Sequence, residues 1–196
     1  MAAEQRRAIA GGCHCGNLRL ELEWPAGAKE MPARACGCSF CIKHGGIWTS
    51  HPAARLALRI ADPADAARYR FGTGTADFHV CRACGIVPAV TCALEGRIYA
   101  VVNVNCLEGI DPATLDRAPT DFEGETAADR LARRRARWIA EVAIEAGRID
   151  RRGAPNRGLP PLRYGVPRPA RDDEVRSIDS VVNAVTSKPP GTVERK

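Results

Sequence analysis

Residues 11–16 read GGCHCG, residues 36–41 read CGCSFC and residues 81–85 read CRACG. These three short stretches hold all but two of the nine cysteines in a chain of 196 residues, and only Cys92 and Cys106 lie outside them. Cysteines that stand two or three positions apart have the spacing of shared metal ligands. The cysteine pattern therefore indicates a fold built around metal sites.

The remaining sequence predicts a compartment in which thiols stay reduced. No apolar run approaches the ~20 residues that a membrane helix needs, and the opening MAAEQRRAIAGG lacks the apolar segment of a secretory signal. We therefore expect a cytoplasmic protein. In that compartment, clustered cysteines bind metal more often than they form disulfides, so metal ligation is favoured over a disulfide framework or inert structural thiols.

The number of clustered cysteines predicts two zinc sites of different kinds. Thiolate sulfurs are soft ligands that favour zinc in tetrahedral geometry. Seven ligands divide into a closed four-ligand structural site and a three-ligand site whose fourth position stays open. The CRACG turn supplies two ligands, and either Cys13 and Cys15 or the 36–41 stretch could supply the other two. Because the 36–41 stretch can hold one ion alone, the economical pairing joins Cys13, Cys15, Cys81 and Cys84.

Short runs of alternating hydrophobicity dominate the first two thirds of the chain. In residues 17–24, Leu18, Leu20, Leu22 and Trp24 alternate with polar residues, which is typical of a half-buried strand. Further strands are expected at residues 46–50, 56–60, 69–71, 77–80, 86–92 and 98–104. No long helix alternates with these strands before residue 125. The sequence therefore predicts a mainly β protein of small antiparallel sheets rather than a doubly wound α/β fold.

The last third of the chain has a different composition. Residues 125–147 are rich in Ala, Leu, Arg and Glu and place Leu131, Trp138 and Val142 at helical spacing, which predicts a basic amphipathic helix packed on the sheets. Residues 148–196 hold seven prolines and four glycines and are expected to form a mostly disordered tail. The predicted organisation is a zinc-binding domain over 1–124, the helix over 125–147 and the tail over 148–196.

The charge distribution argues against a nucleic-acid partner. The chain carries 29 Lys and Arg against 23 Asp and Glu, a net charge of +6. Residues 1–124 are balanced with 13 of each sign, so the whole excess lies in residues 125–196. Bulk attraction to phosphate is therefore not expected of the cysteine-bearing part. The arginines of residues 130–137 could bind RNA or an acidic membrane, but we expect that helix to pack on the sheet.

Together, GGCHCGNLR at residues 11–19, CGCSFC at 36–41 and CRACG at 81–85 resemble the signature of the glutathione-dependent formaldehyde-activating enzymes, whose domain is shared with centromere protein V. The resemblance covers about residues 8–124, in order and with every clustered cysteine present. It implies a β-tent fold of small antiparallel sheets held by zinc. It also implies carbon–sulfur lyase activity, which makes or breaks S-hydroxymethylglutathione. The ligands it implies are Cys13, Cys15, Cys81 and Cys84 for a structural zinc, and Cys36, Cys38 and Cys41 for a functional zinc.

An open zinc site suggests how such a reaction proceeds. A glutathione thiol in the fourth position of the Cys36, Cys38 and Cys41 site would lose its proton, and the thiolate could attack the aldehyde carbon. The alternative is that zinc polarises the aldehyde oxygen. Three anionic ligands weaken that Lewis acidity, so thiol activation is favoured. Arg34 and Lys43 flank the cluster and are candidate partners for the carboxylates of glutathione.

Two residues depart from the family pattern, and two other functions compete with the lyase. Gly37 stands where many relatives have His, and Ile42 where a basic residue is common; neither is a zinc ligand. One rival is a non-catalytic, zinc-stabilised binding module. The other is a methionine sulfoxide reductase B, which needs a redox cysteine such as Cys106. That enzyme holds zinc on two Cys-x-x-Cys pairs, whereas this chain has only one clean pair, Cys81 and Cys84. If they have no redox role, Cys92 and Cys106 are expected to be small buried apolar residues.

Overall fold

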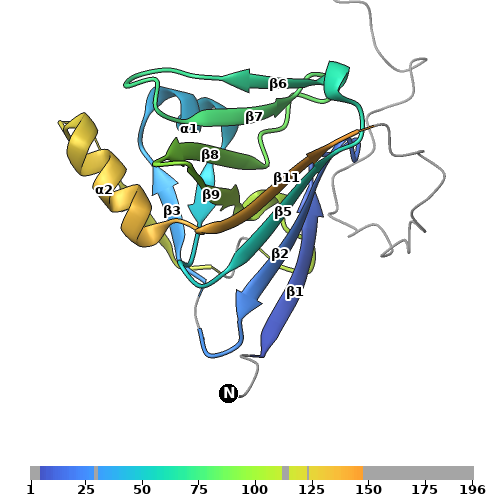
Figure 1. Ribbon diagram of the computed structural model, residues 1–196, viewed down its shortest axis with the longest axis horizontal. Coiled ribbons are helices and arrows are strands. Elements are labelled where there is room, and N and C mark those ends of the chain that lie inside the picture. The colour runs from blue at the N-terminus through green and yellow to red at the C-terminus, as the bar shows by residue number, and fades with distance from the viewer. Residues whose placement is uncertain (1–4, 29–30, 112–114, 123, 148–196) are drawn as a thin grey trace, which may run out of the picture. The chain divides into compact units, whose positions relative to one another are not determined.

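The computed structural model of the protein describes residues 5–28, 31–111, 115–122 and 124–147. The tail expected over residues 148–196 lies outside the described residues. The described part is mainly β, as predicted, and its strands form two sheets (Figure 1). None of its helices is long and apolar enough to cross a membrane.

The four strands of the smaller sheet, which we call sheet A, lie in the order β1 (Arg6–Gly12), β2 (Leu18–Pro25), β5 (Arg55–Ile60) and β11 (Glu141–Ala146). The seven strands of sheet B lie in the order β10 (Arg117–Thr120), β3 (Ala33–Cys36), β4 (Ile47–Thr49), β9 (Arg97–Asn103), β8 (Ala89–Leu94), β7 (Asp77–Cys81) and β6 (Ala66–Tyr69). The helices are α1 (Ser39–His44), α2 (Ala127–Arg137) and the 3-10 turns η1 (Pro63–Asp65) and η2 (Val104–Cys106).

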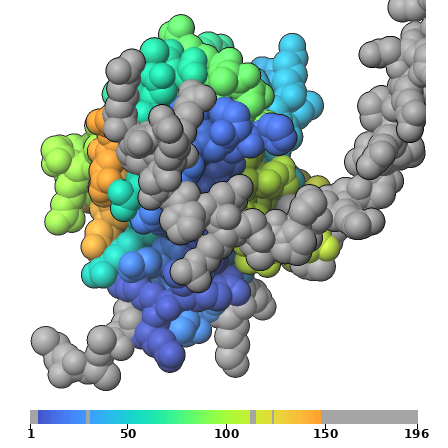
Figure 2. Space-filling model, turned by 90° about the vertical axis from the view of Figure 1, so that its right-hand side faces the viewer, coloured from blue at the N-terminus to red at the C-terminus, as the bar shows by residue number. Residues whose placement is uncertain are grey.

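Both sheets are mixed rather than purely antiparallel. Most neighbouring strands pair antiparallel, but β11 pairs with β5 in parallel and β10 pairs with β3 in parallel. Both parallel strands come from the C-terminal part of the described chain, which returns to close an edge of each sheet. In Figure 2 the N-terminal strands (blue) spread across one face of the molecule, and β11 (orange) runs along one side of it.

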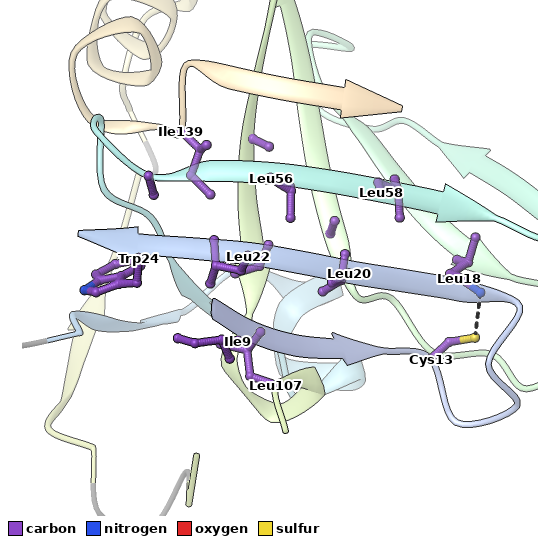
Figure 3. Close-up of a cluster of buried hydrophobic side chains, with 14 of the residues drawn as sticks. Ile9, Cys13, Leu18, Leu20, Leu22, Trp24, Leu56, Leu58, Leu107 and Ile139 are labelled. Atoms are coloured by element: carbon purple, nitrogen blue, oxygen red, sulfur yellow. Dashed lines mark hydrogen bonds between the residues drawn. The ribbon is translucent and has the colours of Figure 1, made fainter. Parts of the chain in front are cut away.

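Sheet A is held by the alternating pattern of β2. Leu18, Leu20, Leu22 and Trp24 are buried and the residues between them are exposed, so one face of the strand enters the core. Leu56 and Leu58 of β5 lie on the same face (Figure 3). Burying each such side chain contributes roughly 1.5–3 kcal/mol, so this face supplies a large part of the stability.

Sheet B is covered on both faces. Ala100 and Val102 of β9 belong to the same core as the leucines of sheet A, whereas Val101 between them faces a second core. The second core includes Val90 of β8 and Trp138, at the end of α2. Sheet B therefore lies between sheet A on one side and α2 on the other.

The helix predicted over residues 125–147 is shorter than expected. It spans Ala127–Arg137, and the chain then turns into the strand β11. In β11, Val142 and Ile144 are half-buried while their neighbours are exposed, so the segment has a period of two that its Ala- and Glu-rich composition concealed. Leu131 and Trp138 pack in the second core but Val142 packs in the first, so the three residues do not form one helical stripe.

Pairing with β5 explains why this segment is extended. β5 would otherwise be an unpaired edge, and β11 satisfies its backbone groups over six register positions from Glu141–Arg55 to Ala146–Ile60. Side chains support the pairing, because Arg55 Nε donates to Glu141 at 2.6 Å and Arg59 Nη1 to Glu145 at 2.7 Å. Tertiary pairing therefore outweighs the helical propensity of this segment.

Candidate metal centres and the adjoining cavity

Four cysteines meet where a turn of sheet A approaches a turn of sheet B. Cys13 and Cys15 lie between β1 and β2, and Cys81 and Cys84 lie at the end of β7 and in the turn that follows. Their sulfur atoms all lie within 4.8 Å of one another. We call these residues the four-cysteine group, and they are the set that spacing predicted.

Backbone geometry brings the first two of these sulfurs into place. A Cβ on Gly12 would come within 2.4 Å of the carbonyl oxygen of Leu18, so only glycine permits this close approach of β1 to β2. The Cys13 N–H donates to the Leu18 carbonyl at 2.8 Å. The Leu18 N–H in turn donates to Cys13 Sγ at 3.1 Å, as drawn in Figure 3.

The four-cysteine group has the dimensions of a zinc site. Tetrahedral zinc with bonds of about 2.3 Å separates its sulfurs by about 3.8 Å. Here Cys13 Sγ lies 3.7 Å from Cys15 Sγ, which lies 3.4 Å from Cys81 Sγ. Burial raises the pKa of Cys81 to about 12. At Cys84 burial works in the same direction, but backbone N–H groups lower its pKa to about 6.

A second group of three cysteines forms around the short helix α1. Cys36 ends β3, Cys38 is the N-cap of α1 and Cys41 lies within that helix. The Cys41 N–H donates to Cys38 Sγ at 3.5 Å, and the sulfurs of this three-cysteine group lie within 4.8 Å of one another. Gly45, in left-handed conformation with φ of 60°, is the C-cap that ends the helix after His44.

Hydrogen bonds link the sulfurs of the three-cysteine group to one another and to a neighbouring tryptophan. The Cys41 thiol donates to Cys36 and so lowers the pKa of Cys36 to about 6, while the same bond raises the pKa of Cys41. The indole Nε1 of Trp48 also donates to Cys41 Sγ at 3.2 Å, and outer hydrogen bonds of this kind hold metal ligands in orientation. Three soft sulfurs so placed fit zinc, with one of its four positions left over.

A cavity of about 490 Å³ opens beside the three-cysteine group. Its lining includes Cys36, Cys38 and Cys41, the aromatic side chains of Phe71, Phe78 and Phe122, and four arginines. The walls come from the outer face of sheet B, the β6–β7 connection and α2. None of the four-cysteine group lines this cavity, so a small molecule can reach one group of sulfurs through it.

The structure brings Arg34 to this cavity but not Lys43. Arg34, on β3, lines the cavity and donates from Nη2 to Ser50 Oγ at 2.6 Å. Lys43 is exposed in the last turn of α1 and does not line the cavity. The other two cysteines lie elsewhere: Cys92 is buried in the second core, and burial raises the pKa of Cys106 to about 12.

Sequence reasoning missed the contribution of α2 to the cavity. Arg130, Arg133 and Arg134 line it, and Trp138 lies beside them. These arginines stand at positions i, i+3 and i+4, which share one face of a helix, so their spacing was an available signal. The spacing alone could not indicate that this face of α2 lies toward the three-cysteine group.

No family model matches the chain, and no curated protein matches it. Among solved structures, the chain is similar to a Rhodobacter sphaeroides protein determined as a structural genomics target. The two share 34% identity over 56% of this chain and 97% of that chain, with a TM-score of 0.43. The description of that protein names no activity or ligand.

Proposed function

We propose that the protein is a carbon–sulfur lyase that forms or cleaves the S-hydroxymethyl adduct of glutathione, or of a related thiol, with formaldehyde or a related aldehyde. One observation carries the proposal. Three cysteine sulfurs lie within 4.8 Å of one another at the wall of a cavity of about 490 Å³, whereas the other four clustered cysteines form a complete set elsewhere. Three ligands beside a cavity are the arrangement of a catalytic rather than a structural zinc site.

In this proposal Cys36, Cys38 and Cys41 hold the zinc ion. When bound, zinc supplies stabilisation of an anionic fourth sulfur, which keeps a substrate thiol deprotonated near neutral pH. Trp48 holds Cys41 through its N–H···S bond, and the aromatic side chains of the cavity exclude water around the reacting groups. Arg34 offers a guanidinium to a carboxylate of the substrate.

The bond changes of the reaction are simple. The substrate thiol gives up its proton, its sulfur attacks the aldehyde carbon and a C–S bond forms. The C=O double bond becomes a single bond, and the oxygen takes up a proton, so the product is the S-hydroxymethyl adduct. Cleavage is the reverse sequence. No oxidant or reductant is needed.

Substitution of one cavity cysteine tests the proposal. We expect Cys38→Ser to keep its fold and one of two zinc ions and to lose its acceleration of adduct exchange. The exchange is followed by NMR with carbon-13 formaldehyde and glutathione. Cys106→Ser is the matched control, because it removes a sulfur outside the cavity and should retain both ions and full rate. If Cys38→Ser kept the full rate, the proposal would fail and a binding module would be favoured.

A further inference from the structure

The cavity carries more positive charge than its structural ion pairs account for. Four arginines line it, namely Arg34 from β3 and Arg130, Arg133 and Arg134 from α2. The acidic residue that pairs with this set is Glu125. It accepts both Nε and Nη2 of Arg133, at 2.7 and 2.8 Å, and lies 3.5 Å from Arg130. Arg130 and Arg133 thus share one carboxylate within the protein, which offsets one of their two positive charges.

Arg134 has no such partner. Its residue is only 7% exposed, and among the described residues no carboxylate forms an ion pair with it. Nη1 donates to the carbonyl and the hydroxyl of Thr75, at 3.1 and 2.7 Å, and lies 3.6 Å from the weakly accepting sulfur of Cys92. Nε is buried with no hydrogen-bond partner. A buried guanidinium without an anion is costly, so its retention at the wall of a cavity points to an anion supplied by a ligand.

Arg34, on β3, is half-buried and also has no carboxylate partner among the described ion pairs. It donates to the neutral hydroxyl of Ser50. Burial and the nearby charges of Arg133 and Arg137 lower its pKa, so the surroundings disfavour its charge. Burial and the charges of Arg130 and Arg133 act on the pKa of Arg134 in the same direction. Neither of these two guanidinium groups thus forms an ion pair among the described residues, and the cavity lining also includes the carboxylate of Asp121.

We infer that Arg134 and Arg34 form an anion subsite that binds a carboxylate of the substrate in the cavity that holds the three-cysteine group. The inference that this substrate carries a thiol rests on the proposed function, whereas the inference of the anion subsite does not. A planar guanidinium pairs with a carboxylate through two parallel hydrogen bonds, and the buried Nε of Arg134 has no hydrogen-bond partner within the described protein. The inferred substrate class is a small thiol that carries at least one carboxylate, and neutral thiols are excluded from efficient binding.

The test uses ligands that cannot react. S-methylglutathione keeps both carboxylates but has no free thiol, and its diethyl ester lacks the carboxylate charges as well. Calorimetric titration of each into the zinc-loaded full chain compares wild type with Arg134→Met and Arg34→Met. Arg135→Met is the matched control, because Arg135 neighbours Arg134 on α2 but is exposed, pairs with Glu95 at 2.9 Å and does not line the cavity.

We expect S-methylglutathione to bind wild type and Arg135→Met alike, and to bind Arg134→Met about thirtyfold more weakly or worse. The ester should bind all variants equally weakly. Equal binding of the free acid by Arg134→Met and Arg135→Met would overturn the inference, as would ester binding as tight as that of the acid. Arg34→Met repeats the test if Arg134→Met does not fold, because Arg34 lies on another element.

Phosphate separates the carboxylate assignment from a general anion site. We expect inorganic phosphate at equal concentration not to displace S-methylglutathione, and displacement would overturn the assignment to a carboxylate. Because none of these ligands can form an adduct, the result does not depend on lyase activity. If the wild-type protein binds S-methylglutathione through Arg134 but does not accelerate adduct exchange, the proposed function alone is rejected. If it accelerates adduct exchange but its binding of S-methylglutathione does not depend on Arg134, the subsite alone is rejected.

Discussion

The two cysteine groups use the same ligand chemistry in different surroundings. The four-cysteine group joins a turn of sheet A to a turn of sheet B and includes the exposed Cys15, yet its four sulfurs lie close enough to share one metal ion. The three-cysteine group lies on one short segment and includes the buried Cys41. It would leave the fourth coordination position of a zinc ion without a cysteine, and it lies beside a cavity. Ligand number and the adjoining cavity, rather than solvent exposure, therefore distinguish the candidate structural site from the candidate catalytic one.

The largest effect is expected from Cys15→Ser. Because Cys15 is exposed, the substitution leaves core packing intact and removes only a ligand. We expect the free energy of unfolding to fall by several kcal/mol, on the order of 5, because a structural zinc supplies folding free energy directly. Urea unfolding and the zinc content would measure it. His14→Ser, one residue away and also exposed, should leave both unchanged, and equal stability of the two variants would contradict the structural role.

A smaller effect, confined to the other group, is expected from Trp48→Phe. The substitution keeps an aromatic side chain in the core but removes the N–H that donates to Cys41 Sγ. Loss of such an outer hydrogen bond weakens metal affinity by about tenfold to a hundredfold. Competition with a chromophoric chelator would show one zinc released more readily and the other unchanged. Weakening of both sites together would mean that the two groups are not independent.

The smallest effect concerns the wall of the cavity. Arg133 lowers the pKa of Glu125 below its ordinary value, so this pair stabilises the fold when the carboxylate is charged. We expect Glu125→Gln to cost about 1 kcal/mol at neutral pH. The stabilisation is present above the ordinary pKa of a glutamate and disappears as the pH falls through the lowered value, so the difference from wild type should shrink in acid. Urea midpoints at a series of pH values check this, and a constant difference would contradict it.

The cysteine groups could be predicted from the sequence because each is made of ligands close together in one or two turns. Arg34 could be placed for a similar reason, since it lies on β3 two residues before Cys36. The position of Lys43 outside the cavity could not be inferred from its nearness to the cysteines in the sequence. Lys43 follows Cys41 by two residues in a helix, and a rotation of about 100° per residue turns it away from the sulfurs.

The cavity wall and the end of α2 depend on tertiary contacts that spacing does not encode. Residues 141–146 have a helix-forming composition, but they form a strand because they pair with the edge of β5. Ile139, just before that strand, exchanges two backbone hydrogen bonds with Ala100 of β9, at 2.9 and 3.0 Å. These contacts anchor the end of α2 on sheet B and so determine which arginines enter the cavity.

X-ray absorption at the zinc edge tests the central claim most directly. In the zinc-loaded full chain, seven cysteine ligands shared by two ions predict an average of about 3.5 sulfurs per zinc. Added glutathione should raise this average to about 4, and S-methylglutathione should not. An average of four sulfurs before any thiol is added, or no rise when glutathione is present, would contradict an open three-cysteine zinc site.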